Sequence, residues 1–257
     1  MPILSVQGLT KTFKLSKKQQ TLEKTKSTTK VAVSDLSFTV NEGEIFGLLG
    51  PNGAGKTTTL RILATLIKPD KGSATLDGFD VVSHANDVRH RIGFLTSELK
   101  LEDFFTPNYL FDFFANLHNV SADRRAARKS ELFERFSISE FAEVKVANLS
   151  TGMKQKVSLA LAIIHDPKII IFDEPTNGLD VITARTVTDF LIEQRSQGKT
   201  IIVSTHIFSL VERICDRAGI IIDGAMAEFG VLSDLTASKS LEDRFFDLYK
   251  ERVGDEL

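Results

Sequence analysis

Hydrophobic and polar residues alternate in two stretches of the first forty positions, residues 3–9 and 31–40. A period of two puts every other side chain on the same face, so both stretches are predicted to be strands with one buried face. Residues 14–30, between them, have few apolar side chains and hold six lysines against one glutamate. This composition predicts a solvated hairpin loop, and leaves open a patch that contacts the phosphates of lipid or of a partner.

From position 44 the pattern changes to short apolar runs separated by helical spacing. The runs at 44–49, 169–174 and 200–205 predict buried strands. Helical spacing follows the first run to about Ile67 and the second through Gln194. Strands that alternate with helices in this way are typical of an α/β domain with a largely parallel central sheet, here preceded by an antiparallel β region.

Residues 97–148 interrupt this alternation. They show no clear strand, are rich in helical spacing, and contain eight of the 19 phenylalanines. We therefore predict a helical subdomain inserted between two halves of one core, residues 1–96 and 149–230. A tail, residues 231–257, completes a single domain over residues 1–257.

Composition narrows the class of protein. With 257 residues, 42% hydrophobic and 26% charged, the chain is expected to fold around a sizeable core. The net charge of −2 gives no global attraction to nucleic acid, and none is expected as a partner. Cys215 is the only cysteine, which excludes an intrachain disulfide and fits a reducing cytoplasm. The first residues do not resemble a secretory signal peptide, and no apolar run approaches the ~18 residues needed to cross a bilayer. If the protein acts at a membrane, a partner is expected to recruit it.

A phosphate-binding motif follows the first apolar run. Residues 50–57 fit the pattern Gly-x-x-x-x-Gly-Lys-Thr at every fixed position. In such a loop the glycines let backbone N–H groups face an anion, Lys56 reaches the β- and γ-phosphates, and the Thr57 hydroxyl binds Mg²⁺. A glycine-rich turn with an incidental lysine is disfavoured by the strand before it and the helix after it. The predicted nucleotide-binding residues here are Gly50, Pro51, Asn52, Gly53, Ala54, Gly55, Lys56, Thr57 and Thr58.

Two acids end the second apolar run. Asp173 would join Thr57 in holding Mg²⁺, and Glu174 would orient and activate the attacking water. Acids at a strand end are more often solvated or salt-bridged, but adjacent carboxylates after a buried run are costly without a cationic or polar partner. The phosphate loop upstream favours the catalytic interpretation. The sequence therefore predicts a P-loop NTPase, an enzyme that hydrolyses a nucleoside triphosphate.

Residues 149–153, Leu-Ser-Thr-Gly-Met, together with these motifs, resemble the ATP-binding cassette family, the ATPase subunits of ABC transporters. The resemblance spans nearly the whole chain. In the family, the corresponding Leu-Ser-Gly-Gly-Gln signature of one subunit closes on the ATP held by another, which implies a head-to-tail homodimer with two ATP molecules between the chains. Ser150, a possible helix N-cap, and Gly152 stand where the family's signature approaches the phosphate.

Other residues match the family's motifs. Residues 175–180 resemble its D-loop, and Asp180 can also cap the following helix. His206 stands where the family has a histidine that contacts the γ-phosphate and holds Glu174 and water in register. Phe13 matches the aromatic residue that stacks on adenine. A lone histidine or phenylalanine at such positions is usually structural, so these roles rest on the resemblance.

The sequence departs from the family at three positions. Ser97 stands where the family has a glutamine that touches Mg²⁺ and water, and a serine is too short to span the same gap. Thr151 and Met153 replace a glycine and the glutamine of the signature. We expect ATPase activity to be retained, with a changed rate or control.

The resemblance also implies partners and location. It indicates a peripheral protein on the cytoplasmic face of the cell membrane, bound to a polytopic permease, that exports sodium, a drug or a lipid. Most phenylalanines of residues 97–148 are expected in the core, with Phe104 and Phe105 exposed to the permease. Two other classes stay open: a soluble ABC ATPase and a nucleotide-dependent regulatory switch.

Overall fold

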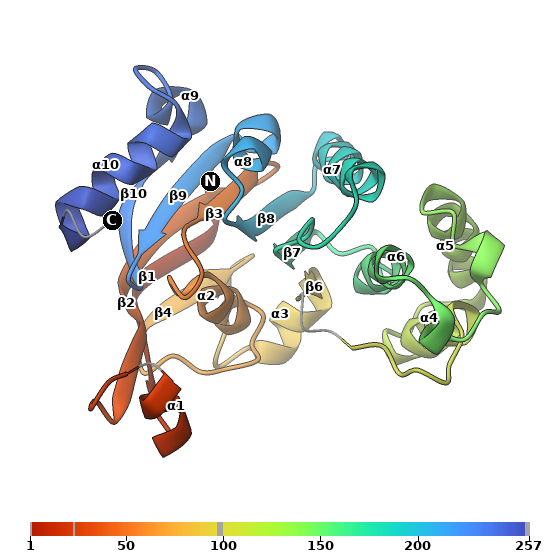
Figure 1. Cartoon of the computed structure of the whole chain (residues 1–257). Coiled ribbons are helices and arrows are strands. Elements are labelled where there is room, and N and C mark those ends of the chain that lie inside the picture. Colours follow the sequence, from red (N-terminus) through yellow and green to blue (C-terminus); the bar gives the residue numbers. More distant parts are fainter. Residues whose placement is uncertain (1, 23, 97–99, 255–257) are drawn as a thin grey trace.

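The computed structural model describes residues 2–22, 24–96 and 100–254, and its strands form two sheets (Figure 1). The larger sheet has the strand order β10-β9-β3-β8-β7-β6 and is parallel except for β10, which confirms the predicted parallel core. Its strands are β3 (Ile45–Leu49), β6 (Ile92–Leu95), β7 (Ile169–Asp173), β8 (Thr200–Thr205), β9 (Arg217–Ile222) and β10 (Ala225–Val231).

The smaller sheet is antiparallel, with the order β2-β1-β4-β5. Its strands are β1 (Pro2–Lys14), β2 (Thr29–Asn41), β4 (Lys71–Leu76) and β5 (Phe79–Asp80). On β2, Leu36, Phe38 and Val40 are buried while the residues between them are not, as the alternating pattern predicts. The β1–β2 ladder continues to the pair of Lys14 with Thr29.

Residues 14–30 are not the plain loop that their composition predicts, because they contain the short helix α1 (Lys17–Leu22). A capping box starts this helix: the Ser16 hydroxyl accepts from the Gln19 N–H at 3.3 Å, and the Gln19 carboxamide oxygen accepts from the Ser16 N–H at 2.8 Å. No residue of α1 is buried. The helix lies apart from the body of the molecule, beyond the end of the β1–β2 ladder (Figure 1).

Helix α2 (Lys56–Leu63) follows the phosphate loop and ends four residues before the predicted end at Ile67. Thr65 has φ +64°, and its N–H donates to the carbonyl of Ile62, while the Leu66 N–H donates to that of Arg61, each at 2.9 Å. These two bonds form a Schellman motif. The helix therefore stops even though its apolar spacing continues.

Helices occupy most of the remaining described chain. Those of the core are α3 (Ala85–Arg91), α7 (Val181–Ser196), α8 (Phe208–Ile214), α9 (Leu232–Leu235) and α10 (Leu241–Val253). The inserted region holds α4 (Pro107–Leu117), α5 (Ala122–Arg135) and two 3₁₀ turns, Ser139–Phe141 and Val146–Asn148, and is followed by α6 (Thr151–Ala162). Residues 100–148 contain no strand, as predicted. Figure 1 shows α4 and α5 at one side of the molecule, with α6 between them and the sheet.

One hydrophobic cluster joins the helical region to the parallel sheet. It includes Phe111 and Phe136 from the helical region and Ile170 and Phe172 from β7. Four of the eight phenylalanines between Phe104 and Phe141 are buried. The helical region is therefore packed as part of the same core, while its boundaries at 97 and 148 stay a prediction.

The phenylalanines expected to be exposed differ from each other. The Phe104 side chain is 63% exposed, as predicted. Phe105 is only partly exposed: it packs against the core cluster, and its ring stacks on Tyr109 with 4.4 Å between centroids. The prediction for Phe105 is wrong because its ring is covered by Phe104, at 4.2 Å between centroids, and by Tyr109. Phe113, which was expected in the core, is half exposed.

Cys215 is buried against Gly47 of β3. A Cβ at Gly47 would lie 2.8 Å from the Cys215 sulfur, so only glycine fits there. Burial raises the pKa of the Cys215 thiol far above its usual value, and the residue acts as a small buried side chain. Among the described helices, none has the length and apolar character required to span a bilayer.

Candidate active site

The phosphate loop connects β3 to α2 and depends on glycine at two points. A Cβ on Gly50 would lie 2.3 Å from the carbonyl oxygen of Ile221. Gly55 has φ +99°, and a Cβ there would lie 2.2 Å from the carbonyl oxygen of Ala32. The loop is thus wedged between β2 and the end of β9, and any side chain at these two positions would push it out of place.

Lys56, the motif's lysine, is buried beneath this loop. Its ammonium donates to the carbonyl oxygens of Gly50 at 2.6 Å and Pro51 at 3.2 Å, and forms an ion pair with Glu174 at 3.4 Å. The charge is therefore fixed between the loop and Glu174, the acid that follows β7. An anion seated on the loop would meet it without a large movement of the side chain.

Asp173 ends β7 and is buried. Its Oδ1 accepts a hydrogen bond from the Ser204 hydroxyl, whereas its Oδ2 is buried and has no hydrogen-bond partner among the described residues. A buried carboxylate oxygen without a partner is destabilising, and a cation would remove that penalty. Within the described chain no group of three or more acidic, histidine or cysteine side chains forms a metal cage. One carboxylate with the hydroxyl of Thr57 and substrate phosphates fits Mg²⁺, which uses few protein ligands.

Glu174 directly follows β7 with φ +51°, an unusual backbone conformation for this residue type. Two hydrogen bonds hold it there, because its N–H donates to the carbonyl oxygen of Ser204 at 3.0 Å and to the Ser204 hydroxyl at 3.3 Å. Its carboxylate lies between Lys56 and His206, whose Nδ1 is 3.0 Å from Oε2. A carboxylate accepts hydrogen bonds only, so Nδ1 of His206 carries the proton. The acid is thus clamped between two basic side chains.

A cavity of about 380 Å³ contains most of the predicted ATP-binding residues. Phe13 and Glu174 line it together with loop and helix residues 51–58, so the fold brings the adenine candidate, the phosphate loop and the acid to one place. Its volume suits a small-molecule ligand. Lys30 and Asn177 also line it, and sequence reasoning assigned neither to ATP. Lys30 pairs with Phe13 across the β1–β2 ladder, so the strand register could have placed it there.

The signature residues and Asp180 of the D-loop lie elsewhere, whereas Asn177 of the D-loop is at the cavity. Ser150 caps α6, where its hydroxyl accepts from the Met153 N–H at 3.2 Å, and Asp180 caps α7, where it accepts from the Thr183 N–H at 3.0 Å. Both capping predictions are confirmed. Hydrogen bonds from Thr183 lower the pKa of Asp180. Ser150, Gly152 and Asp180 do not line the cavity, so one chain presents only part of the predicted ATP-binding set.

The three departures from the family pattern have different positions. Ser97 lies outside the described residues. Thr151, the first residue of α6, is exposed. Met153 is partly buried and packs its apolar side chain against the core cluster, where the family's glutamine would be polar.

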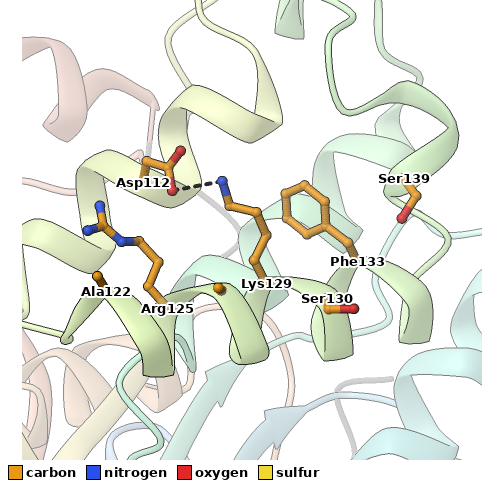
Figure 2. A pocket seen from close by; sticks show the side chains of 8 residues that line it. Asp112, Ala122, Arg125, Lys129, Ser130, Phe133 and Ser139 are labelled. Atoms are coloured by element: carbon orange, nitrogen blue, oxygen red, sulfur yellow. Dashed lines mark ion pairs between the residues drawn. The ribbon is translucent and has the colours of Figure 1, made fainter.

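A larger hollow, of about 430 Å³, lies between α4 and α5 (Figure 2). Its two cations are already partnered: Lys129 pairs with Asp112 at 2.7 Å, and Arg125 donates to the Asn116 side chain at 2.8 Å. None of the predicted site residues lines it. Chemistry therefore favours the smaller cavity at the phosphate loop as the candidate active site.

A phosphate loop at the end of a parallel strand, with an acid pair at the end of the next strand but one in the same sheet, defines the class of P-loop nucleoside triphosphatases. The particular family follows from the comparison with known proteins. The family model described as ABC transporter matches residues 33–177, so the chain belongs to the ABC transporter family and is one of its ATP-binding, ATP-hydrolysing subunits.

Similar proteins include transporter ATP-binding proteins of bacteria. The chain is 40% identical over 213 residues to the ABC transporter ATP-binding protein NatA of Bacillus subtilis, which covers 82% of this chain and 87% of NatA. It is 40% identical over 195 residues to the Nod factor export ATP-binding protein I of Burkholderia lata, which covers 76% of this chain and 64% of that protein. It is 32% identical over 206 residues to the linearmycin resistance ATP-binding protein LnrL of Bacillus subtilis, which covers 80% of this chain and 66% of LnrL.

Solved structures give the same fold. An ATP-binding subunit of an ABC transporter superposes with a TM-score of 0.83 at 27% identity, over 96% of this chain and 100% of the other. The ATP-binding cassette MJ0796, a dimer bound to ADP and Pi in a post-hydrolysis state, superposes with a TM-score of 0.77 at 26% identity, over 89% of this chain and 98% of MJ0796.

Proposed function

We propose that two copies of this chain bind ATP and Mg²⁺, close head to tail, and drive export of a cargo through separate membrane subunits. The observation that carries the proposal is the division of the site. Phe13 and the phosphate loop line the cavity, whereas Ser150 and Gly152 stand outside it at the start of α6. A second copy could bring that helix end, with its free N–H groups and positive dipole, to the γ-phosphate. The dimeric form of MJ0796 supports this arrangement.

The residues of the site suggest how hydrolysis would proceed. Water attacks the γ-phosphorus in line with the bond to ADP, and Glu174 orients the water and accepts its proton. His206 positions the Glu174 carboxylate through the 3.0 Å contact. Asp173 and Thr57 would hold Mg²⁺, which would neutralise part of the phosphate charge.

Lys56 would change partners during binding. Its ion pair with Glu174 at 3.4 Å competes with the attraction of a γ-phosphate for the same ammonium. When phosphate takes Lys56, one carboxylate oxygen of Glu174 becomes available to water while the other stays on His206. Binding would thus activate the acid.

A permease would dock on an exposed apolar stripe of the helical region. Tyr109, Phe113 and Leu117 follow one face of α4 at four-residue spacing, with Phe104 beside them, and all four are at least half exposed. Grouped exposed apolar side chains of this size mark interaction sites. The peripheral position of the chain on the cytoplasmic face of the membrane would follow from this contact.

The class of cargo follows from the relatives' names. The relatives named for Nod factor export and linearmycin resistance favour export of a small molecule such as a drug, and a lipid and sodium stay further candidates. A nucleotide-dependent regulatory switch is a second proposal, favoured by the apolar Met153 in the signature. Slow ATP turnover that does not respond to the permease would support the switch.

The Glu174→Gln variant tests the mechanism. Removing the general base should lower the rate of ATP hydrolysis by roughly 10²- to 10⁴-fold. ATP should then hold the variant as a dimer in light scattering. The control is Glu140→Gln, an exposed residue outside the cavity, which should hydrolyse ATP as the wild type does. Undiminished hydrolysis would remove Glu174 from its role, and only monomers at saturating ATP would refute dimer closure.

A second experiment tests the docking surface. Phe104→Asp with Phe113→Asp should abolish co-purification of membrane proteins with the tagged chain, because two charges would enter an apolar contact. Basal ATP hydrolysis should remain. The control pair, Val82→Asp and Phe246→Asp, alters exposed apolar side chains elsewhere and should keep the complex. An intact complex in the first variant would place the permease on another surface.

A further inference from the structure

Residues 14–30, called here the basic hairpin, form a positive pole on an acidic protein. The segment has six lysines and one glutamate, a formal charge of +5. The whole chain carries −2, so the remaining residues carry −7. Concentrating one sign of charge in this way costs self-repulsion and creates a strong local field.

The hairpin is held away from the body of the protein. Pairing between β1 and β4 reaches only Thr10, which pairs with Lys71, whereas the β1–β2 ladder continues to Lys14 and Thr29. Beyond Thr10 the two strands therefore lack a third strand. They carry α1 outward, as Figure 1 shows.

Most of the hairpin's charges take no part in the fold. Five of its lysines are exposed and form no ion pair with an acidic residue that the structure describes: Lys14, Lys17, Lys18, Lys24 and Lys26. Some lysines elsewhere take part in the fold, since Lys129 pairs with Asp112 and Lys168 with Glu42. The free charges are therefore available to an anionic partner.

An exposed leucine indicates which anionic partner fits. Leu22, the last residue of α1, is 72% exposed among these lysines. At a membrane surface, the lysines can contact the lipid headgroups and the leucine at the end of α1 can contact the acyl chains. Nucleic acid fits less well, because residues 14–30 contain no aromatic side chain to stack on bases and no arginine. A lipid surface uses both features.

We propose that the basic hairpin binds anionic lipid headgroups at the membrane surface beside the permease. This inference rests on the proposed function, which brings the chain to a membrane through α4. In Figure 1, α1 and α4 both lie on the lower side of the molecule, at opposite ends. A second contact at the membrane surface would hold the subunit more firmly than the permease contact does alone.

Binding of the full-length protein to lipid vesicles tests the proposal without a permease or nucleotide. The probes are vesicles of phosphatidylcholine alone and vesicles with 30% phosphatidylglycerol, at about 0.15 M salt. The hairpin variant carries Lys17→Gln, Lys18→Gln, Lys24→Gln and Lys26→Gln. The matched control carries the same change at four exposed lysines elsewhere: Lys68→Gln, Lys71→Gln, Lys145→Gln and Lys250→Gln. Lys14 and Lys30 are left intact, because they lie beside Phe13 and in the cavity.

Wild type and control should bind only the anionic vesicles, and more weakly as salt is raised. Each lysine lost from the hairpin should weaken binding by about fivefold, so the four together should weaken it by about a hundredfold or more. Leu22→Ser should cause a smaller loss that salt does not change. All variants should bind ATP normally, which separates this result from a failure of the ATPase or of the dimer.

Four outcomes would overturn the proposal. Wild type could fail to bind anionic vesicles, the hairpin variant could bind as wild type does, or the control could lose binding equally. Binding of the hairpin to RNA or to an acidic peptide in preference to the vesicles would also overturn it.

Discussion

Ser204 should govern how the site uses Mg²⁺, although the sequence pattern gives it no role. Its buried hydroxyl on β8 donates to Asp173 and accepts from the Glu174 N–H at 3.3 Å. Ser204→Ala would leave both Asp173 oxygens without a hydrogen bond from the described protein. A hydrogen bond to a charged group contributes about 1.5–3 kcal/mol, which is about 10- to 100-fold in an equilibrium constant. Supporting residues of metal ligands have effects of this size.

The assay is ATP hydrolysis as a function of Mg²⁺ concentration at saturating ATP. Ser204→Ala should require about 10- to 100-fold more Mg²⁺ for half of its maximal rate, and excess Mg²⁺ should restore most of that rate. Ser158→Ala is the matched control, because this buried serine donates to the Lys154 carbonyl at 3.0 Å, away from the cavity. A well-folded Ser204→Ala protein with the Mg²⁺ dependence of wild type would refute the role assigned to Asp173 and its support.

Two further predictions concern stability. Burial, together with the stacked ring of His118, lowers the pKa of His165 to about 4, so between pH 6.5 and 4 the unfolded chain binds a proton that the folded chain does not. The free energy of unfolding should therefore fall by up to about 3 kcal/mol as the pH falls from 6.5 to 4. Chemical denaturation at several pH values should show that this free energy depends less on pH in His165→Asn than in wild type. The control His84→Asn, at an exposed histidine, should keep the pH dependence of wild type. Asp180→Ala should lower the free energy of unfolding by about 1 kcal/mol and Tm by about 2–4 °C, because α7 loses its N-terminal cap. Asp180→Asn should keep both values, because asparagine also caps helices. An unchanged Tm in the alanine variant would contradict this prediction.

The sequence predicts the strands and the phosphate loop well, because periodicity and glycine sterics act locally. Residues 169–173 and 200–205 are strands as their apolar runs indicate. Two local signals are missed: the capping box at Ser16, which starts α1, and the left-handed Thr65, which ends α2. Apolar spacing reports burial and carries no information about where backbone hydrogen bonds close a helix.

The parts of the site that escape prediction depend on contacts between distant segments. Ser204 reaches Asp173 because β8 pairs with β7 in a particular register, and Lys30 reaches the cavity because it pairs with Phe13. Phe105 is half-buried because of the turn that leads into α4. Each case requires knowledge of which strand or helix is the neighbour, and one-dimensional patterns do not contain it.

Burial of the chain's single thiol has a practical consequence for future work. Cys215 is packed against Gly47 and its thiol stays protonated, so maleimides and disulfide reagents should not react with it in the native state. Cysteines introduced at the surface can then be labelled one at a time in an otherwise natural background. Spin or fluorescent probes placed on α6 and on the phosphate-loop side could follow the approach of two copies during a turnover cycle.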